Sequence, residues 1–179
     1  MSDMDDYATD RSDAVALYYH PMDSKRYKLA VEVSNGLYGQ NLIDKVYSFG
    51  TKEGYSGYKK PAGFVKHFFN ANRAEVAGVF NSSKIFINTS VSEGLNLTPI
   101  EATLCGCPSI VCDGAINELF IDGVTCFVST KDDYFEILND SIELLSDYDI
   151  YRVQFADNLR EIIEDYTWDN LIAKFNELL

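Results

Sequence analysis

The sequence predicts an α/β domain built on a single Rossmann-like, doubly wound parallel sheet of about six strands. Short apolar runs alternate along the chain with segments of helical periodicity, a pattern typical of a parallel sheet covered by helices on both faces. The chain has 179 residues, enough for one domain with a substantial core. Ligands of such sheets bind beyond the carboxyl ends of the strands, so a functional site is expected at that edge.

The predicted strands are apolar runs of four to seven residues, bounded by turn residues or helix starts. They span residues 13–19, 45–49, 63–69, 84–88, 109–112 and 125–128. Residues 50–62 are rich in Gly, Tyr and Lys, and this stretch is too short to hold a crossover helix of normal length. We therefore expect a loop there.

The helices are predicted from N-cap residues followed by apolar residues at helical spacing. Asp23 or Ser24 caps a first helix that runs to about Asn35, with Gly36 as its stop signal. Asn72, with Glu75 three residues on, caps the second. Five more helices are predicted. One begins at Thr98, one covers 115–121, one begins at Thr130 and one covers 149–164. The last carries Trp168, which is expected in the core or at a lid contact.

Composition limits the classes of function. The net charge of −13 repels DNA, RNA and anionic lipid, so a phosphate site must be a local exception built from amides and a few Lys or Arg. No apolar run approaches the ~20 residues that span a bilayer, and no signal-peptide core follows Met1. We expect a cytoplasmic chain without membrane insertion. The acidic residues 1–12 lack periodicity and are expected to be a flexible lead-in to a domain over 13–179.

The four cysteines are interpreted as small buried thiols. They are Cys105, Cys107, Cys112 and Cys126. Their number and clustering do not suit a disulfide framework. A zinc site is not expected either, because Cys105 and Cys107 lack the usual two-residue gap and a second pair of ligands.

One stretch, residues 92–108, organises the predicted site. It reads as the end of a buried strand, a glycine turn and a helix start, for which Thr98 is the expected N-cap, Pro99 the first helical residue and Glu101 a capping-box acid. The amides of residues 94–96 then lie near the positive end of the helix, where an anion such as a sugar diphosphate is favoured. His20, Gly50, Phe68 and Glu93 all lie at or just past predicted strand ends, so they are expected to line one crevice.

The same stretch resembles a known family. Glu93 and Glu101, inside S-E-G-L-N-L-T-P-I-E-A, resemble the signature of glycosyltransferase family 4, and the following L-C-G-C-P-S-I-V-C-D-G is similar to the family's A-C-G-x-P-V-I-x-S/T-D. The resemblance covers the chain from about Asp13 onward. It implies the C-terminal, donor-binding half of a GT-B fold, with the acceptor-binding N-terminal domain missing from this chain. It also implies a nucleotide-sugar substrate, retention of anomeric configuration, and neither metal nor cofactor.

The resemblance assigns roles to the residues of the turn. Glu93 would be the catalytic residue, which faces the donor sugar, contacts its hydroxyls and supports charge at the reacting carbon. Glu101 would accept hydrogen bonds from the ribose hydroxyls, as a carboxylate can from a vicinal diol. The amides of Gly94, Leu95 and Asn96 would face the diphosphate. Simpler interpretations remain, because Glu93 could be a solvated acid beside a turn and Glu101 could be the capping partner of Thr98.

A second segment departs from the family pattern. Residues 19–26, Y-H-P-M-D-S-K-R, occupy the place of the family's G-R-x-x-x-x-K-G, so Lys25 matches the diphosphate-binding lysine and His20 replaces the arginine. Either His20 donates to the phosphate as a titratable substitute, or Arg26 supplies the missing charge. The Y-H-P-x-x-x-K form is similar to a branch that acts in surface-polysaccharide and rhamnan assembly. The alternative for Lys25 and Arg26 is an exposed first helical turn.

Two further donor-binding candidates come from the resemblance. Phe68 ends the strand whose backbone would read the nucleotide base, and Glu118 falls in A-I-N-E-L, similar to the family's G-G-x-x-E-x segment. The alternative for Glu118 is a solvated helix face. His67, in the middle of its strand, is interpreted as a satisfied sheet histidine.

The sequence therefore favours a glycosyltransferase domain that binds a nucleotide-diphosphate sugar for transfer to a glycan or lipid-linked acceptor in polysaccharide biosynthesis. Because the acceptor domain is missing, the isolated chain is expected to bind the donor and to transfer little. Two alternatives stay open. One is a non-catalytic Rossmann-like interaction or nucleotide-binding module, and the other is a protein similar to sugar-nucleotide epimerases.

Overall fold

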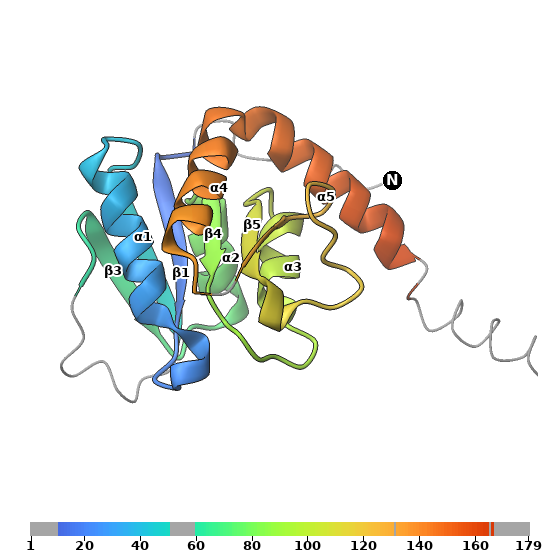
Figure 1. Ribbon diagram of the computed structural model, residues 1–179, viewed down its shortest axis with the longest axis horizontal. Helices are drawn as coiled ribbons and strands as arrows, with labels where there is room; N and C mark the ends of the chain where they lie inside the picture. Colours follow the sequence, from blue (N-terminus) through green and yellow to red (C-terminus); the bar gives the residue numbers. More distant parts are fainter. Residues whose placement is uncertain (1–10, 51–59, 131, 165, 167–179) are drawn as a thin grey trace, which may run out of the picture.

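Six strands form one parallel sheet in the order β3-β2-β1-β4-β5-β6 (Figure 1). The computed structural model describes residues 11–50, 60–130, 132–164 and 166. The strands are β1 (Ala14–Tyr19), β2 (Lys45–Gly50), β3 (Phe64–Phe69), β4 (Ile85–Asn88), β5 (Ser109–Cys112) and β6 (Phe127–Ser129). This order is that of a doubly wound Rossmann-like sheet, so the predicted fold class is confirmed.

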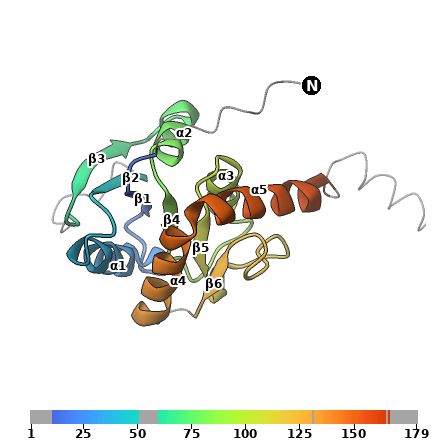
Figure 2. The same ribbon diagram turned by 90° about the horizontal axis from the view of Figure 1, so that it is seen from above.

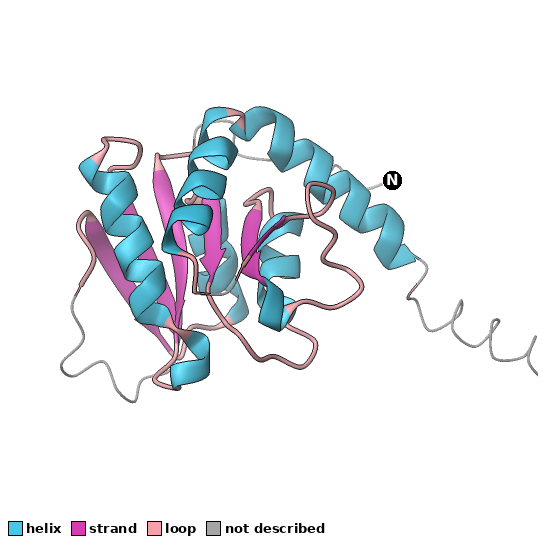
Figure 3. Cartoon of the chain, viewed as in Figure 1, coloured by secondary structure: helices cyan, strands magenta, loops and turns pink. Residues whose placement is uncertain are grey.

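Helices cover both faces of the sheet, as Figures 2 and 3 show. They are α1 (Tyr27–Gly39), α2 (Arg73–Asn81), α3 (Leu97–Leu104), α4 (Tyr134–Ser146) and α5 (Tyr148–Glu164), with 3-10 turns η1 (Asp23–Lys25) and η2 (Asp113–Ala115). Helices α1 and α4 share one apolar cluster with the sheet, and α2 and α3 share another on the opposite face. In Figure 2, α5 runs beyond α4 and past α3. No described helix has the length and apolar character needed to cross a bilayer.

The central strand explains this two-sided packing. In β1, Val15, Leu17 and Tyr19 belong to the α1 and α4 cluster, while Ala16 belongs to the α2 and α3 cluster. Successive side chains of a strand point to opposite faces, and here both faces are covered. Residues 14–17 are accordingly 0% exposed. A strand buried in this way reads as a continuous apolar run rather than as an alternating one.

The first helix differs from the prediction at both ends. Residues 23–25 form a 3-10 turn, Arg26 adopts a left-handed conformation with φ of 47°, and α1 begins only at Tyr27. The helix then continues through Gly36 to Gly39, so the expected stop at Gly36 is wrong. A Cβ on Gly36 would lie 2.4 Å from the hydroxyl oxygen of Tyr134. Gly36 therefore allows α1 to pack closely on α4 instead of ending the helix.

Four other predicted elements are corrected. Helix α3 begins at Leu97 with Asn96 as N-cap, and not at Thr98. Ala115 ends η2, and residues 116–121 are turns and irregular chain instead of a helix. Asn117 Oδ1 accepts from the Leu119 amide at 2.9 Å, and its Nδ2 donates to the carbonyl of Leu95 at 2.8 Å. Asp133, rather than Thr130, caps α4 by accepting from the amides of Phe135 and Glu136, both at 3.0 Å. The strand at 125–128 lies one to two residues further on, as β6.

The second helix forms as predicted. Asn72 and Glu75 make a reciprocal capping box, in which Asn72 Oδ1 accepts from the Glu75 amide at 3.0 Å and the Glu75 carboxylate accepts from the Asn72 amide at 2.9 Å. Most of the predicted loop at 50–62 and the helix predicted around Trp168 lie outside the described residues.

Arg11 anchors the start of the described chain. Its side chain is 7% exposed, and its guanidinium donates to the carbonyls of Phe80, Ser83 and Cys105. Phe80 lies in the last turn of α2, Ser83 precedes β4 and Cys105 follows α3, so one side chain joins three segments. Arg11 falls within the stretch expected as a lead-in, whose residues 1–10 lie outside the described part.

Candidate functional site

The segments that follow β1 and β4 are held together at the carboxyl edge of the sheet. The two strands pair directly, for example Leu17 with Ile87. Beyond them, the amide of Val91 donates to the carbonyl of Ser24 at 2.8 Å. The Thr89 hydroxyl lies 3.0 Å from the carbonyl oxygen of Lys25 and 2.9 Å from that of Arg26. These bonds fix the lysine-bearing turn against the segment that carries Glu93.

Lys25 and Glu93 meet at this edge as an ion pair. Their side chains are 14% and 17% exposed, so the pair is largely shielded from water. The pKa of the nearby Tyr18 hydroxyl is raised by burial and, to a smaller extent, by the negative charge of Glu93. The structure thus brings together the two residues to which the sequence assigned the diphosphate and the donor sugar.

The turn after Glu93 offers free backbone donors. Gly94 and Leu95 are exposed, and within the described part of the chain neither amide nitrogen donates a hydrogen bond. A Cβ placed on Gly94 would have no atom within 4 Å, so space remains beside the turn. Amides at the start of a helix attract anions, because the helix dipole adds to their partial positive charge. The arrangement can hold a phosphate next to the Lys25 ammonium.

Asn96 closes this turn and caps α3 with its backbone only. Its side chain makes no bond to the helix amides. It accepts instead from Asn88 Nδ2 at 3.0 Å and donates to the carbonyl of Ala115 at 3.0 Å. Its predicted contribution to donor binding can therefore come only from its backbone.

Glu101 lies one turn into α3 and faces a different space from Glu93. It is exposed and lines a groove of about 360 Å³ between α2 and α3, together with Arg73, Val76 and Cys105. The capping box with Thr98 is not formed, since α3 is capped at Asn96. The residues that line this groove include Glu101 but not Glu93.

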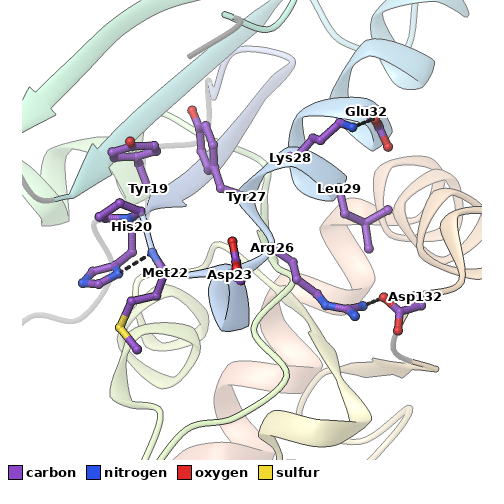
Figure 4. A pocket seen from close by; sticks show the side chains of 11 residues that line it. Tyr19, His20, Met22, Asp23, Arg26, Tyr27, Lys28, Leu29, Glu32 and Asp132 are labelled. Carbon is purple, nitrogen blue, oxygen red and sulfur yellow. Dashed lines mark hydrogen bonds and ion pairs between the residues drawn. The ribbon is translucent and has the colours of Figure 1, made fainter. Parts of the chain in front are cut away.

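His20 and Arg26 line a cleft whose walls include neither Lys25 nor Glu93. This cleft, of about 580 Å³, lies against the start of α1 (Figure 4). In Figure 4 the Arg26 side chain extends to Asp132, with which it forms an ion pair, while His20 Nδ1 accepts from the Met22 amide at 3.2 Å. The structure therefore places Arg26 apart from the Lys25–Glu93 pair, with its charge balanced by Asp132.

The remaining candidates, Phe68 and Glu118, line neither the cleft nor the groove. Phe68 is half-buried beside the α2 cluster, with the Lys66 ammonium 4.2 Å from its ring centre. Glu118 is exposed next to Asn117, whose side chain bonds to Leu95. His67 lies 2.9 Å from the Ser48 hydroxyl through Nδ1, and burial lowers its pKa to about 4. It is neutral at physiological pH, in agreement with its interpretation as a sheet histidine.

Two supporting residues were missed by the sequence reasoning. Thr89 and Asn88 hold the two sides of the site but touch no predicted ligand. The signal that could have found them is a run of polar residues directly after a buried strand, at the edge where the site was expected. Across the described ranges, no three His, Cys, Asp or Glu side chains gather in a way that could hold a metal ion.

Comparison with known proteins points to one family. The sequence profile described as "Glycosyl transferases group 1" matches residues 48–147. A search of curated proteins gives no significant match.

Solved structures share the fold at low identity. An S. aureus TarM mutant in complex with fondaparinux, alpha-GlcNAc-glycerol and UDP aligns with a TM-score of 0.72 and 18% identity, over 95% of this chain and 36% of TarM. Anabaena HepE, in complex with UDP and glucose, aligns with a TM-score of 0.70 and 17% identity, over 94% of this chain and 49% of HepE. This chain thus spans about a third of TarM and half of HepE.

A third structure is itself a single domain. It is the C-terminal domain of LpcC, a glycosyl transferase group 1 family protein from Francisella tularensis, with a TM-score of 0.66 and 18% identity over 84% of each chain. The whole described sheet thus matches one Rossmann-like half of the two-domain GT-B fold.

Proposed function

The chain belongs to the glycosyl transferases group 1 family, and on that premise we propose that it is the donor-binding domain of an enzyme that uses a nucleotide-diphosphate sugar. The observation that carries the proposal is that the unbonded amides of Gly94 and Leu95 and the Lys25 ammonium occur together at one edge of the sheet. A diphosphate needs both kinds of donor. These local donors would offset the repulsion that a net charge of −13 exerts on an anionic ligand.

The donor would lie along the edge with its parts in separate places. The ribose contacts Glu101 in the groove between α2 and α3, whose wall includes Val76 and Arg73. The diphosphate contacts the turn amides and Lys25. The sugar then comes next to Glu93, which is held in place by its ion pair with Lys25. This order explains why the two glutamates need not share a pocket.

The residues present can assist the chemistry in two ways. Lys25 and the turn amides stabilise the negative charge that develops on the leaving diphosphate, and such preorganised donors are a large part of catalysis. Glu93 is positioned to support positive charge at the reacting carbon of the sugar. We infer retention of anomeric configuration with neither a metal nor a cofactor, and the UDP and glucose bound to HepE make a UDP-sugar the first donor to test.

The acceptor would be bound by a partner domain. Leu95, Leu97 and Ile116 are 59%, 53% and 47% exposed and surround the turn. Exposed apolar residues gathered around a site favour an interface. We propose that a second domain or subunit covers this rim, binds a glycan or lipid-linked acceptor and excludes water. The role in polysaccharide biosynthesis, the rhamnan-type branch and the cytoplasmic location are part of the same proposal.

Donor binding is tested by titrating the purified chain with UDP, GDP and dTDP and following its melting temperature. We expect one of them to raise the melting temperature, and Glu101→Ala and Lys25→Met to remove most of the rise. Glu161→Ala, at an exposed position of α5, is the matched control and should behave as wild type. If none of the diphosphates binds, or if both site variants bind as wild type does, the proposal is wrong.

A further inference from the structure

Asn96 uses its side chain in a way that its position does not require. An asparagine at a helix N-terminus commonly accepts a hydrogen bond from an amide two or three residues on. Asn96 makes no such bond. It is 8% exposed, and its amide group bridges Asn88 and the carbonyl of Ala115. The amide group therefore serves tertiary contacts and leaves the first amides of α3 uncapped.

Asn88 completes a closed arrangement. It is the last residue of β4, is 4% exposed, and its Oδ1 accepts from the Ser90 amide at 2.9 Å while its Nδ2 donates to Asn96. The two buried amides thus join the ends of the segment that carries Glu93 and Gly94. Through Ala115, the same chain of bonds reaches the turn that follows β5.

The backbone of Asn96 needs this support. Its φ of 43° and ψ of 59° lie in the left-handed region, which is unfavourable for a residue with a Cβ. Such a conformation persists where surrounding contacts fix it. The bonds to Asn88 and Ala115 are contacts of this kind, and they involve the residue at which the turn passes into α3.

We propose that Asn96 and Asn88 are positioning residues, whose side chains hold the 93–96 turn in the shape that receives the donor diphosphate without touching the donor. The inference rests on the proposed function, because it assigns these bonds to the donor site. Both side chains are buried and bonded to protein atoms, so they act on the ligand only through the backbone of the turn. A turn fixed before binding loses less entropy when the ligand arrives.

Asn96→Gly is the most informative variant, since glycine adopts the left-handed conformation freely but cannot make either bridge. We expect its affinity for UDP, measured by calorimetry, to fall about tenfold. The affinity for UMP, which lacks the second phosphate, should fall much less. Asn41→Gly is the matched control. Asn41 is also left-handed, with φ of 57°, but it is exposed and lies between α1 and β2, away from the turn.

Two further measurements separate positioning from general loss of stability. NMR order parameters of the Gly94 and Leu95 amides, without ligand, should fall from about 0.85 to below about 0.6 in Asn96→Gly and stay unchanged in Asn41→Gly. Asn88→Ala should reproduce the loss of UDP affinity. The double variant should lose little more than either single one, because both changes break the same bridge.

The outcomes distinguish this inference from the function on which it rests. If the wild-type chain binds none of UDP, GDP and dTDP, the donor-binding function is refuted, and the positioning role with it. If wild type binds UDP and Asn96→Gly binds it equally well, the function stands and the positioning role is overturned. An equal loss of UDP and UMP affinity with unchanged order parameters also overturns it.

Discussion

Lys25 and Glu93 form an ion pair across the carboxyl ends of β1 and β4, with 14% and 17% of their side chains exposed. The lysine that would bind the diphosphate is thus already neutralised by the acid that would face the sugar. An incoming diphosphate must share or replace this partner. The ion pair holds both side chains at the site. The Glu93 carboxylate also repels the diphosphate, which is a second anion competing for Lys25.

The first prediction separates these two effects. Lys25→Met should weaken UDP binding tenfold or more, about 1.4 kcal/mol. It should also lower the free energy of unfolding by about 1–2 kcal/mol, because it leaves Glu93 shielded without its partner. Glu93→Gln should instead bind UDP as well as wild type or better, since Lys25 is released. Calorimetry and urea unfolding measure both. Equal losses of affinity in the two variants would contradict this account.

The second prediction concerns Glu101, which is exposed at the groove between α2 and α3. Glu101→Gln should change the free energy of unfolding by no more than about 0.5 kcal/mol. It should weaken binding of UDP about tenfold, because a carboxylate is a stronger acceptor for the ribose hydroxyls than an amide. Binding of inorganic pyrophosphate should not change. A parallel loss of pyrophosphate binding would show that Glu101 acts elsewhere than at the ribose.

The third prediction follows from His67, whose pKa is lowered from 6.5 to about 4 by burial. Between these two values the unfolded chain binds more protons at this residue than the folded one, so stability rises with pH there. The contribution is complete above about pH 6.5 and is lost as the pH falls toward about 4. Urea unfolding of wild type and His67→Gln should therefore show a difference that changes between pH 7 and pH 4.5. A constant difference would refute the assignment.

The fourth prediction concerns the buried Arg11. Arg11→Met keeps the apolar stem but removes the donors to Phe80, Ser83 and Cys105. Each buried carbonyl left without a donor costs about 1–3 kcal/mol, although part of this is recovered by water. We expect a loss of about 2–4 kcal/mol in the free energy of unfolding. Arg160→Met is the control, because Arg160 pairs with its neighbour Asp157 on the surface of α5 and should contribute little.

The sequence predicted the sheet well because local pattern determines most of it. The strands were found within one or two residues, since buried parallel strands are short apolar runs between turn residues. Errors arose where a tertiary contact decided the outcome. Gly36 looked like a helix stop, but it is the contact point of α1 with Tyr134 of α4. Nothing within the sequence of α1 indicates that contact.

The site was predictable in part. The edge of the sheet at which to look follows from the fold class. The crevice expected to join His20, Gly50, Phe68 and Glu93 stays a prediction, since the cleft that contains His20 includes none of the other three. The ion pair of Lys25 with Glu93 was not predicted, since the two residues are brought together only by the pairing of β1 with β4. Either His20 or Arg26 was expected to supply a further charge at the phosphate, yet Arg26 is left-handed and its guanidinium pairs with Asp132. The bonds of the Asn96 side chain to Asn88 and Ala115 were not predicted either.

The central position of β1 in the sheet affects the chain while it is being synthesised. Val15 pairs with Ile85, about 70 residues further on, so the middle of the sheet stays open until that later strand has been made. At a synthesis rate of roughly 5–20 residues per second, this delay lasts several seconds. During that time the apolar strand β1 can pair with β2 but not with β4. The nascent chain therefore exposes an unpaired, apolar strand edge to which chaperones can bind. A chain truncated before β4 should aggregate and should not fold into a smaller domain.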